Sequence, residues 1–271
     1  MDRYAVIGNP VEHSKSPVIH REFARQTGQE IDYGRILSPL DAFRDTVLRF
    51  RDKGGKGLNV TVPFKLEAFQ LTTTLTSRAS HAEAVNTFKF EQDRIIGDNT
   101  DGAGLVRDIQ NNLGLDIERK RILLLGAGGA AQGVLYPLLD QEPALLVIAN
   151  RTLDRALEMQ RKVEQRDVLS RTVSAQTYES LEGLSFDIII NATSAGLTDS
   201  ALPIPPGIFA ADALAYDMMY GRETPFMQFA RREGAQVADG LGMLVEQAAE
   251  SFYLWRDVRP DTRTVIEKLR Q

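Results

Sequence analysis

A glycine-rich segment near the middle of the chain has the residue types and the spacing to bind a phosphate group. It reads Gly126-Ala127-Gly128-Gly129-Ala130-Ala131. An apolar strand candidate over residues 122–125 precedes it, and an amphipathic helix candidate through Val134 and Leu138 follows it. This order of strand, glycine turn and helix is typical of dinucleotide-binding units, in which main-chain N–H groups at the helix N-terminus face the pyrophosphate. The alternative is an ordinary glycine-rich turn between a strand and a helix.

The residues after the next strand candidate, 145–149, indicate which dinucleotide binds. NAD-binding units place an Asp or Glu at this point to hold the ribose hydroxyls. This chain has Asn150-Arg151-Thr152 there, and Arg155 follows about one turn later. A carboxylate would repel a 2′-phosphate, whereas two guanidinium groups attract it. The segment therefore predicts NADP as the cofactor, against the alternative that these arginines are only solvated.

Hydride transfer from NADPH to a carbonyl leaves an alkoxide, and the site must supply an acid or a cation beside that oxygen. Lys65 is the best candidate, since it follows Pro63 at the end of a strand candidate. Asp101 stands in a glycine-flanked turn, and Asn86 stands among apolar neighbours, which suggests a buried amide with a specific partner. The plain alternatives are a solvated lysine that begins a helix, an aspartate that caps one, and an asparagine satisfied within a turn.

Two serines between the first strand candidate and the first helix candidate, Ser14 and Ser16, have the chemistry to bind an anion. Ser16 precedes Pro17, and this pair is typical of a helix N-cap followed by the first helical residue. Hydroxyls and free main-chain amides at a helix N-terminus also suit a carboxylate. Capping alone would explain Ser16 but not Ser14.

Strand-like and helix-like segments alternate along the chain, which indicates an α/β fold with parallel sheets. The predicted strands cover residues 4–7, 58–64, 84–90, 94–97, 121–126, 144–150, 186–191 and 213–217. The predicted helices cover residues 17–23, 41–53, 102–113, 240–255 and 264–269. We therefore expect a Rossmann-like domain in the second half, a separate α/β domain before it, and a ligand-binding cleft between them.

The composition argues against several classes of protein. With 271 residues, a net charge of -5 and a pI near 5.4, the chain lacks the basic character of nucleic-acid binders. It contains no cysteine, and its three histidines show no metal-ligand spacing, so we expect neither disulfides nor a metal site. No apolar run approaches the roughly 18 residues of a membrane span, and the N-terminus does not have the layout of a signal peptide. A cytoplasmic enzyme without a membrane partner is expected.

Ten short motifs, taken in order, resemble those of the shikimate dehydrogenase family over essentially the whole chain. The first half contains Tyr4-Ala5-Val6-Ile7-Gly8-Asn9-Pro10, His13-Ser14-Lys15-Ser16-Pro17, Asn59-Val60-Thr61-Val62-Pro63-Phe64-Lys65, Ala84-Val85-Asn86-Thr87 and Gly97-Asp98-Asn99-Thr100-Asp101-Gly102. The second half contains Gly126-Ala127-Gly128-Gly129-Ala130, Asn150-Arg151-Thr152, Asn191-Ala192-Thr193-Ser194, Asp217-Met218-Met219-Tyr220 and Asp239-Gly240-Leu241-Gly242-Met243-Leu244-Val245-Glu246-Gln247-Ala248. The combination is highly specific.

The resemblance implies an NADP-dependent oxidoreductase that reduces 3-dehydroshikimate to shikimate, a step toward chorismate and aromatic amino acids. It implies a catalytic pair, Lys65 and Asp101. The substrate residues that it implies are Ser14, Ser16 and Tyr220 for the carboxylate, and Thr61, Lys65, Asn86, Asp101 and Gln247 for the ring hydroxyls and the reacting oxygen. The cofactor residues that it implies are Gly126, Ala127, Gly128, Gly129 and Ala130 for the pyrophosphate, Asn150, Arg151, Thr152 and Arg155 for the 2′-phosphate, and Thr193, Met218 and Gly240.

The resemblance also implies the division of the chain. A substrate domain is expected over residues 1–101 and 240–271, because the long C-terminal helix would return to it, and an NADP-binding Rossmann domain over residues 102–239. The expected assembly is a monomer or a homodimer. Two positions depart from the family pattern: Glu83 stands where many members have Gly, and Ser77 stands where some have an acidic residue. Glu83 matters because Gly adopts a positive φ readily and Glu does not.

Two other functions are compatible with parts of this pattern. A quinate/shikimate dehydrogenase would accept quinate as well as shikimate and can use NAD. An NADP-binding sensor of the same fold would need no proton donor, so the intact Lys65 and Asp101 argue against it.

Overall fold

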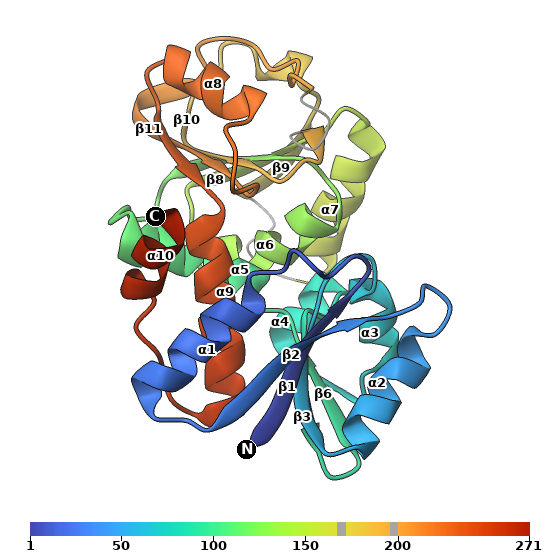
Figure 1. Ribbon diagram of the computed structural model, residues 1–271. Helices are drawn as coiled ribbons and strands as arrows, with labels where there is room; N and C mark the ends of the chain where they lie inside the picture. Colours follow the sequence, from blue (N-terminus) through green and yellow to red (C-terminus); the bar gives the residue numbers. More distant parts are fainter. Residues whose placement is uncertain (167–171, 196–199) are drawn as a thin grey trace. The chain divides into compact units, whose positions relative to one another are not determined.

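The computed structural model describes residues 1–166, 172–195 and 200–271 (Figure 1). They form two compact units, and each is considered by itself. The first contains Met1–Asp108 and Met243–Gln271, and the second contains Ile109–Gly242. Each unit is built on one six-stranded sheet in the described part of the chain. The predicted α/β fold is confirmed. The prediction of parallel sheets holds for the second unit but is wrong for the first, whose sheet is mixed because the strand over Thr87–Glu91 runs antiparallel to both of its neighbours.

The sheet of the first unit has the strand order β2-β1-β3-β5-β6-β4. Its strands are β1 (Asp2–Gly8), β2 (Ile31–Leu37), β3 (Gly55–Val60), β4 (Thr74–Leu75), β5 (Thr87–Glu91) and β6 (Arg94–Asp98). The first three strands run parallel, and β5 is antiparallel to both of its neighbours. The helices are α1 (Ser16–Thr27), α2 (Phe43–Asp52), α3 (Lys65–Leu71), α4 (Ser77–Ala82), α5 (Asp101–Arg107) and α10 (Arg263–Arg270), together with most of α9 (Leu241–Arg256).

Alternation along β1 distributes the core of this unit between the two faces of the sheet. Ala5 and Ile7 pack in one cluster with residues of α2 and α3, and Tyr4 and Val6 pack in another with Trp255 of α9. Successive side chains of a strand point to opposite faces, so both faces of β1 must be covered by helices. The residues after Met243 are therefore part of the core of the first unit, although they follow the second unit in the chain.

The strand predicted over residues 58–64 ends earlier than expected, at Val60. Pro63 has no N–H to continue a ladder, and the Phe64 N–H donates to the Thr61 carbonyl at 3.1 Å, which forms a turn. A strand that continued to residue 64 would place Val60, Val62 and Phe64 on one face, but Val62 is 63% exposed whereas Phe64 is buried. This turn places Lys65 as the first residue of α3.

The sheet of the second unit is parallel throughout, with the order β12-β11-β10-β7-β8-β9. Its strands are β7 (Arg121–Leu125), β8 (Leu145–Ala149), β9 (Val173–Gln176), β10 (Phe186–Asn191), β11 (Phe209–Asp217) and β12 (Gln236–Asp239). The helices are α6 (Gly129–Leu139), α7 (Leu153–Arg166) and α8 (Pro225–Arg232). This is the doubly wound order of dinucleotide-binding folds, in which ligands bind where the strand order reverses, here between β7 and β10.

Glu83 ends α4 in the left-handed region, with φ 50° and ψ 30°. A Cβ in this region costs roughly 1–2 kcal/mol, part of which glycine loses again through its larger entropy in the unfolded chain. We expect Glu83→Gly to be more stable than Glu83→Ala by about 1 kcal/mol, measured by urea unfolding. Both variants lack the carboxylate, so the comparison isolates the backbone.

The exposed Glu158 within α7 provides the control for this prediction. There the glycine variant should be the less stable of the two by about 1 kcal/mol. The same sign at both positions would show that the left-handed conformation of Glu83 carries no strain.

Candidate active site and cofactor site

A lysine–aspartate pair lies at the N-termini of two short helices of the first unit. Lys65 begins α3 and Asp101 begins α5. The Lys65 Nζ lies 2.5 Å from Asp101 Oδ2, and the two side chains are 34% and 16% exposed. The pair is therefore in hydrogen-bond contact and still open on one side, as a group that exchanges a proton with a ligand must be.

Asn86 is buried and holds the second oxygen of the Asp101 carboxylate. Its Nδ2 donates to Asp101 Oδ1 and to Thr100 Oγ1, both at 2.9 Å, and lies 3.3 Å from Gln247 Oε1. Its Oδ1 accepts from the Thr100 N–H at 2.9 Å. These partners define the orientation of the amide, with its donor toward Asp101. The structure thus joins Lys65, Asn86, Asp101 and Gln247 in one hydrogen-bonded cluster.

A second layer of buried polar residues lies behind this cluster, and the sequence analysis did not identify it. The Thr87 hydroxyl donates to Asn86 Oδ1 at 2.8 Å and lies 2.8 Å from the Ser251 hydroxyl. The Asn59 Nδ2 donates to both hydroxyls, at 3.2 Å to Thr87 and 2.9 Å to Ser251. The Asn59 Oδ1 accepts from the Tyr33 hydroxyl at 2.7 Å. Asn59 was visible in its motif as a polar residue in an apolar strand, but its partners come from β2, β5 and α9.

His20 is fully buried and completes this layer. Its Nε2 lies 3.1 Å from Asn59 Oδ1, and its ring stacks on Tyr33 with centroids 4.3 Å apart. Because Asn59 Oδ1 can only accept, Nε2 carries the proton and Nδ1 is the acceptor, which has no hydrogen-bond partner among the described residues. Burial lowers the pKa of His20 from 6.5 to about 3. His20 is therefore neutral at physiological pH and is not an acid or a base of the site.

This shift predicts a loss of stability in acid. Between pH 6.5 and about 3 the unfolded chain binds a proton at His20 that the folded chain does not bind. The stability is therefore complete above pH 6.5 and falls by about 1.4 kcal/mol per pH unit as the pH drops through this window. Urea unfolding at pH 7 and at pH 4.5 should show a smaller difference in His20→Gln, whose amide replaces the Nε2 donor. The exposed His13→Gln should behave as the wild type, and an unchanged slope in His20→Gln would contradict the assignment.

Ser14 and Ser16 contact each other at the start of α1. The Ser14 hydroxyl donates to Ser16 Oγ at 3.2 Å and accepts from the Ser16 N–H at 3.3 Å. The prediction that Ser16 is the N-cap is wrong: Ser16 is the first helical residue, Lys15 holds the N-cap position, and no side chain of the cap residue makes the capping bond. The Ser14 hydroxyl accepts from the Ser16 N–H instead. Arg35 donates to the Ser14 carbonyl at 2.7 Å, so an arginine supports this loop.

The remaining substrate candidates, Thr61 and Tyr220, lie outside these two groups. The Thr61 methyl packs against Gly8, where a Cβ would approach it to 2.4 Å. Among the described residues no hydrogen bond joins the Thr61 side chain to the serine pair or to the lysine cluster. Tyr220 follows β11 in the second unit, and burial raises the pKa of its hydroxyl.

The buried carboxylate of Glu250 anchors α9, the helix that carries Gln247. Glu250 lies 2.5 Å from Arg259 Nη1 and 3.2 Å from Arg78 Nη1. Burial works to raise the pKa of Glu250, but the hydrogen bonds and charges of these two arginines hold it below its ordinary value. Glu250 is therefore ionised and paired, which anchors α9 within the first unit.

The glycine turn of the second unit leaves a helix N-terminus open. Gly126 follows β7 with φ 105°, and a Cβ there would lie 3.2 Å from the Ala192 carbonyl. Gly128 is the N-cap of α6, which begins at Gly129. Since Gly128 has no side chain, it makes no capping bond to the free N–H groups of the helix. A Cβ on Gly128 or Gly129 would meet no atom within 4 Å. The main chain is therefore accessible to a pyrophosphate, and these residues fit the dinucleotide that the sequence predicts.

The loop after β8 presents its two arginines to solvent. The Asn150 Nδ2 donates to the Thr152 carbonyl at 2.8 Å, which shapes the turn before α7. Arg151 and Arg155 are exposed, and neither has an ion-pair partner within the described parts of the chain. Burial raises the pKa of Tyr178, while the nearby charge and main-chain N–H of Arg151 work to lower it.

The other cofactor candidates, Thr193, Met218 and Gly240, lie just after the carboxyl ends of β10, β11 and β12. The Thr193 hydroxyl donates to Asn191 Oδ1 at 2.7 Å, and the Asn191 Nδ2 donates to Asp217 Oδ2 at 3.0 Å. A Cβ on Gly240 would lie 2.3 Å from the Met218 carbonyl, so this position requires glycine. No cluster of three His, Asp or Glu that could hold a metal ion occurs among the residues that the structure describes.

Comparisons with known proteins match segments of both units. The family description "Shikimate dehydrogenase substrate binding domain" matches residues 6–88, "Shikimate / quinate 5-dehydrogenase" matches 107–198, and "Shikimate 5'-dehydrogenase C-terminal domain" matches 240–270. Shikimate dehydrogenase (NADP(+)) of Methylobacillus flagellatus is 60% identical over 271 residues, covering 100% of this chain and 99% of the relative.

Solved structures agree over the full length. An Ael1 enzyme from Pseudomonas putida is 50% identical with a TM-score of 0.93, covering 99% of this chain and 98% of that one. Shikimate 5-dehydrogenase from Thermus thermophilus, in complex with NADP(H) and shikimate, is 30% identical with a TM-score of 0.86, covering 100% and 99%. In residues 1–166, 172–195 and 200–271, no helix combines the length and the apolar character that a bilayer span requires.

Proposed function

This chain belongs to the shikimate dehydrogenase family, and we infer from this that it interconverts 3-dehydroshikimate and shikimate with NADP(H), in the biosynthesis of chorismate and aromatic amino acids. The observation that supports this reaction is the pair of Lys65 and Asp101, whose carboxylate is held by Asn86. An NADP-binding sensor would not need this pair.

The proposed reaction is a hydride transfer followed or accompanied by a proton transfer. NADPH supplies the hydride to the carbonyl carbon when it is bound. The Lys65 Nζ donates a proton to the carbonyl oxygen, which becomes the hydroxyl of shikimate, and takes the proton back in the reverse direction. Asp101 holds the ammonium group at 2.5 Å, and Asn86 orients the carboxylate. We propose that Thr61 and Gln247 bind ring hydroxyls beside this pair.

The substrate carboxylate is proposed to bind at Ser14 and Ser16, and Tyr220 is proposed as a further substrate residue. The Ser14 hydroxyl now donates to Ser16 Oγ, a weak neutral bond that a carboxylate can replace. Two hydroxyls bind less strongly than a guanidinium does, which suits a metabolite that must leave after each turnover.

We expect Ser14→Ala to raise the KM for shikimate by about tenfold and to change kcat little, since a hydrogen bond to a charged group contributes roughly 1.5–3 kcal/mol. The Ser14 hydroxyl also accepts from the Ser16 N–H. Ser14→Ala, and not Ser16→Ala, should therefore lower the free energy of unfolding by roughly 1 kcal/mol, the usual contribution of a helix cap. The measurements are steady-state kinetics and urea unfolding. A substrate analogue without its carboxylate is the control, and Ser14→Ala should bind it as the wild type does. Further weakening with that analogue would place the carboxylate elsewhere.

NADP is proposed to bind in the second unit, with its pyrophosphate at Gly126, Ala127, Gly128, Gly129 and Ala130. The proposed 2′-phosphate ligands are Asn150, Arg151, Thr152 and Arg155, and Thr193, Met218 and Gly240 would line the nicotinamide side. We also propose that the substrate-binding part is 1–101 with 240–271, that the NADP-binding part is 102–239, and that the enzyme is a cytoplasmic monomer or homodimer without a nucleic-acid partner.

An absorbance assay at the nicotinamide band tests this function directly. Shikimate and quinate should each be offered with NADP and with NAD. Turnover should be largest with shikimate and NADP. Comparable turnover of quinate, or with NAD, would favour the quinate/shikimate dehydrogenase alternative, and no turnover of either acid would overturn the proposal.

A further inference from the structure

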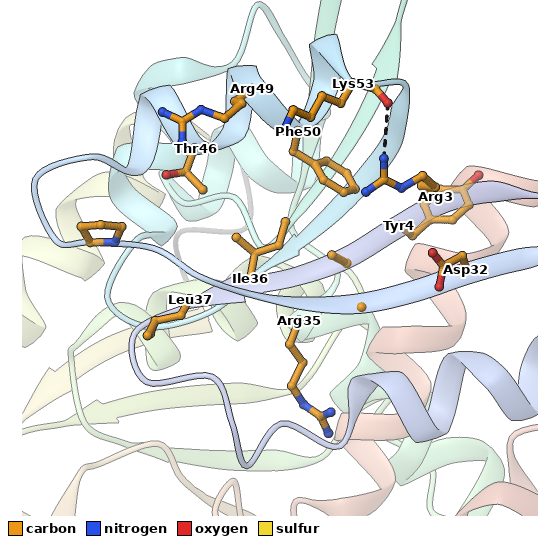
Figure 2. A pocket seen from close by; sticks show the side chains of 13 residues that line it. Arg3, Tyr4, Asp32, Arg35, Ile36, Leu37, Thr46, Arg49, Phe50 and Lys53 are labelled. Carbon is orange, nitrogen blue, oxygen red and sulfur yellow. Dashed lines mark hydrogen bonds between the residues drawn. The ribbon is translucent and has the colours of Figure 1, made fainter.

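A hollow of 440 Å³ opens on the first unit between β2 and α2 (Figure 2). None of the residues proposed for substrate or cofactor binding lines it. Its floor is the outer part of the sheet, where β2 is the edge strand. It is a separate feature whose chemistry the reductase reaction does not use.

The hollow exists because two adjacent floor positions are small. Ala5 and Gly34 are direct neighbours in the register of β1 and β2, and a Cβ on Gly34 would meet nothing within 4 Å. Ile36, two residues along β2, and Phe50 of α2 supply larger apolar walls. The floor is therefore apolar and carries no bulky side chain at Gly34.

One face of α2 gives the hollow its charge. Thr46, Arg49, Phe50 and Lys53 line it with the spacing i, i+3, i+4 and i+7, the last of them just after the helix. Arg3 approaches from β1, with its guanidinium 5.7 Å from the Phe50 ring centroid and a hydrogen bond of 3.4 Å to the Lys53 carbonyl. Figure 2 shows Arg3 beside Phe50 and Arg49 farther along the helix, while Arg35 points away from them.

These cations are not neutralised. In the described parts of the chain, Arg3, Arg49 and Lys53 make no ion pair, and the nearby acids Asp2 and Asp52 are bound to Arg256 and Arg51. The lining residues include four cations and one carboxylate, Asp32. Arg35 points away from the others, which leaves Arg3, Arg49 and Lys53 against one negative charge. The chain as a whole has a net charge of -5, but the hollow has a local excess of positive charge, which attracts anions.

We propose that this hollow binds a small aromatic carboxylate. The ring would lie on the Ala5–Gly34 floor beside Phe50, and the carboxylate would bind Arg49 or Arg3, whose planar forks match its two oxygens. The volume lies in the usual range of small-ligand pockets, which combine apolar walls with a few polar groups. An anion without an apolar body would leave the floor exposed, and a neutral ring would leave the cations unused.

Binding of benzoate, followed by ligand-observed NMR titration, tests the proposal. Benzoate should bind saturably, and benzyl alcohol should not. Arg49→Gln should weaken benzoate about three- to fivefold, since ion pairs at exposed sites contribute up to about 1 kcal/mol. Gly34→Val, which fills the floor, should abolish binding while shikimate turnover persists. Arg44→Gln, an equal charge change on α2 outside the hollow, is the control and should bind as the wild type does.

The results that would overturn the proposal are equally specific. They are the absence of saturable benzoate binding, equal affinity in Arg49→Gln and the wild type, or equal weakening in Arg44→Gln. Sedimentation of the same variants tests whether two copies of the protein associate through the hollow. If the wild type self-associates and Arg49→Gln does not, the hollow is covered by a second copy and is not a ligand site.

The buried layer behind Asn86 carries a second, independent inference. From Tyr33 to Asp101, every hydrogen-bond donor points toward the lysine–aspartate pair: Tyr33 to Asn59, Asn59 to Thr87, Thr87 to Asn86, and Asn86 to Asp101. Reversing the amide of Asn86 would place two acceptors against each other at Asp101. We propose that Thr87 is a positioning residue, which holds the Asn86 amide so that its donor faces Asp101. This proposal depends on the proposed function.

Thr87→Val keeps the shape of the side chain and removes the hydroxyl. We expect kcat to fall by about tenfold with an unchanged KM for NADP, and Thr87→Ser, which restores the donor, to recover most of the loss. A structural role alone would lower stability without this split or this rescue. Thr27→Val, which removes a hydroxyl bond to the Phe23 carbonyl in α1, is the control. If Lys65→Ala is inactive while Thr87→Val has full kcat, the positioning role is wrong and the proposed function stands.

Discussion

Lys65→Ala should lower kcat by roughly 100-fold or more while NADP binding is retained. Proton transfer from a positioned group contributes 10²–10⁴-fold to such reactions, and the Lys65 Nζ is the ammonium group held at 2.5 Å by Asp101. The residue lies in the first unit and NADP is proposed to bind in the second, so its removal leaves the cofactor site unchanged. Steady-state kinetics with shikimate and a separate NADP titration measure the two effects.

A double-mutant comparison decides how the pair works. If Asp101 acts by holding Lys65, then Asp101→Asn with Lys65→Ala should be no worse than the poorer single variant, because residues that act as a unit are not additive. Multiplied losses would show that the two act independently. Lys56→Ala, an exposed lysine on β3, controls for the loss of a positive charge. Near-normal turnover in Lys65→Ala would make Lys65 an ordinary surface lysine.

Arg151→Ala should raise the KM for NADP by about tenfold or more and change the KM for NAD little. A charge-assisted bond to a phosphate contributes roughly 1.5–3 kcal/mol, and each 1.4 kcal/mol corresponds to a factor of ten. Arg151 is exposed and unpaired within the described residues, so no internal partner competes with the 2′-phosphate. Salt should weaken NADP binding in the wild type and have less effect in the variant.

Two further variants test this prediction. Arg155→Ala should show the same preference with a similar or smaller loss, since it lies about one turn later on α7. Arg161→Ala, an exposed arginine farther along the same helix, is the matched control and should bind both cofactors normally. Equal losses with NADP and NAD in Arg151→Ala would remove the 2′-phosphate assignment.

The predicted strands and the missed strands differ in their places in the sheets. The sequence predicts β1, β3, β5, β6, β7, β8, β10 and β11, which have neighbours on both sides. It does not predict β2, β4, β9 and β12, which are the edges of the two sheets. A central strand is buried and therefore reads as an apolar run, whereas an edge strand is partly solvated and reads as polar or short. The edge strand β2 contains Gly34 and two charged residues for this reason.

The order of the elements, the dinucleotide motif and the residue types of the catalytic pair could be predicted from the sequence, because each depends on residues close together in the chain. The turn at Pro63 and the cap of α1 were misjudged, since each depends on which main-chain groups meet. The orientation of the Asn86 amide toward Asp101 could be seen only in the folded chain. Hydrogen bonds to Thr87 and Thr100 set this orientation, and Thr87 is in turn held by Asn59 and Ser251. Hydrogen bonds between residues up to 192 positions apart have no signature in a local pattern, and only packing of β3, β5 and α9 around one core brings their partners within reach.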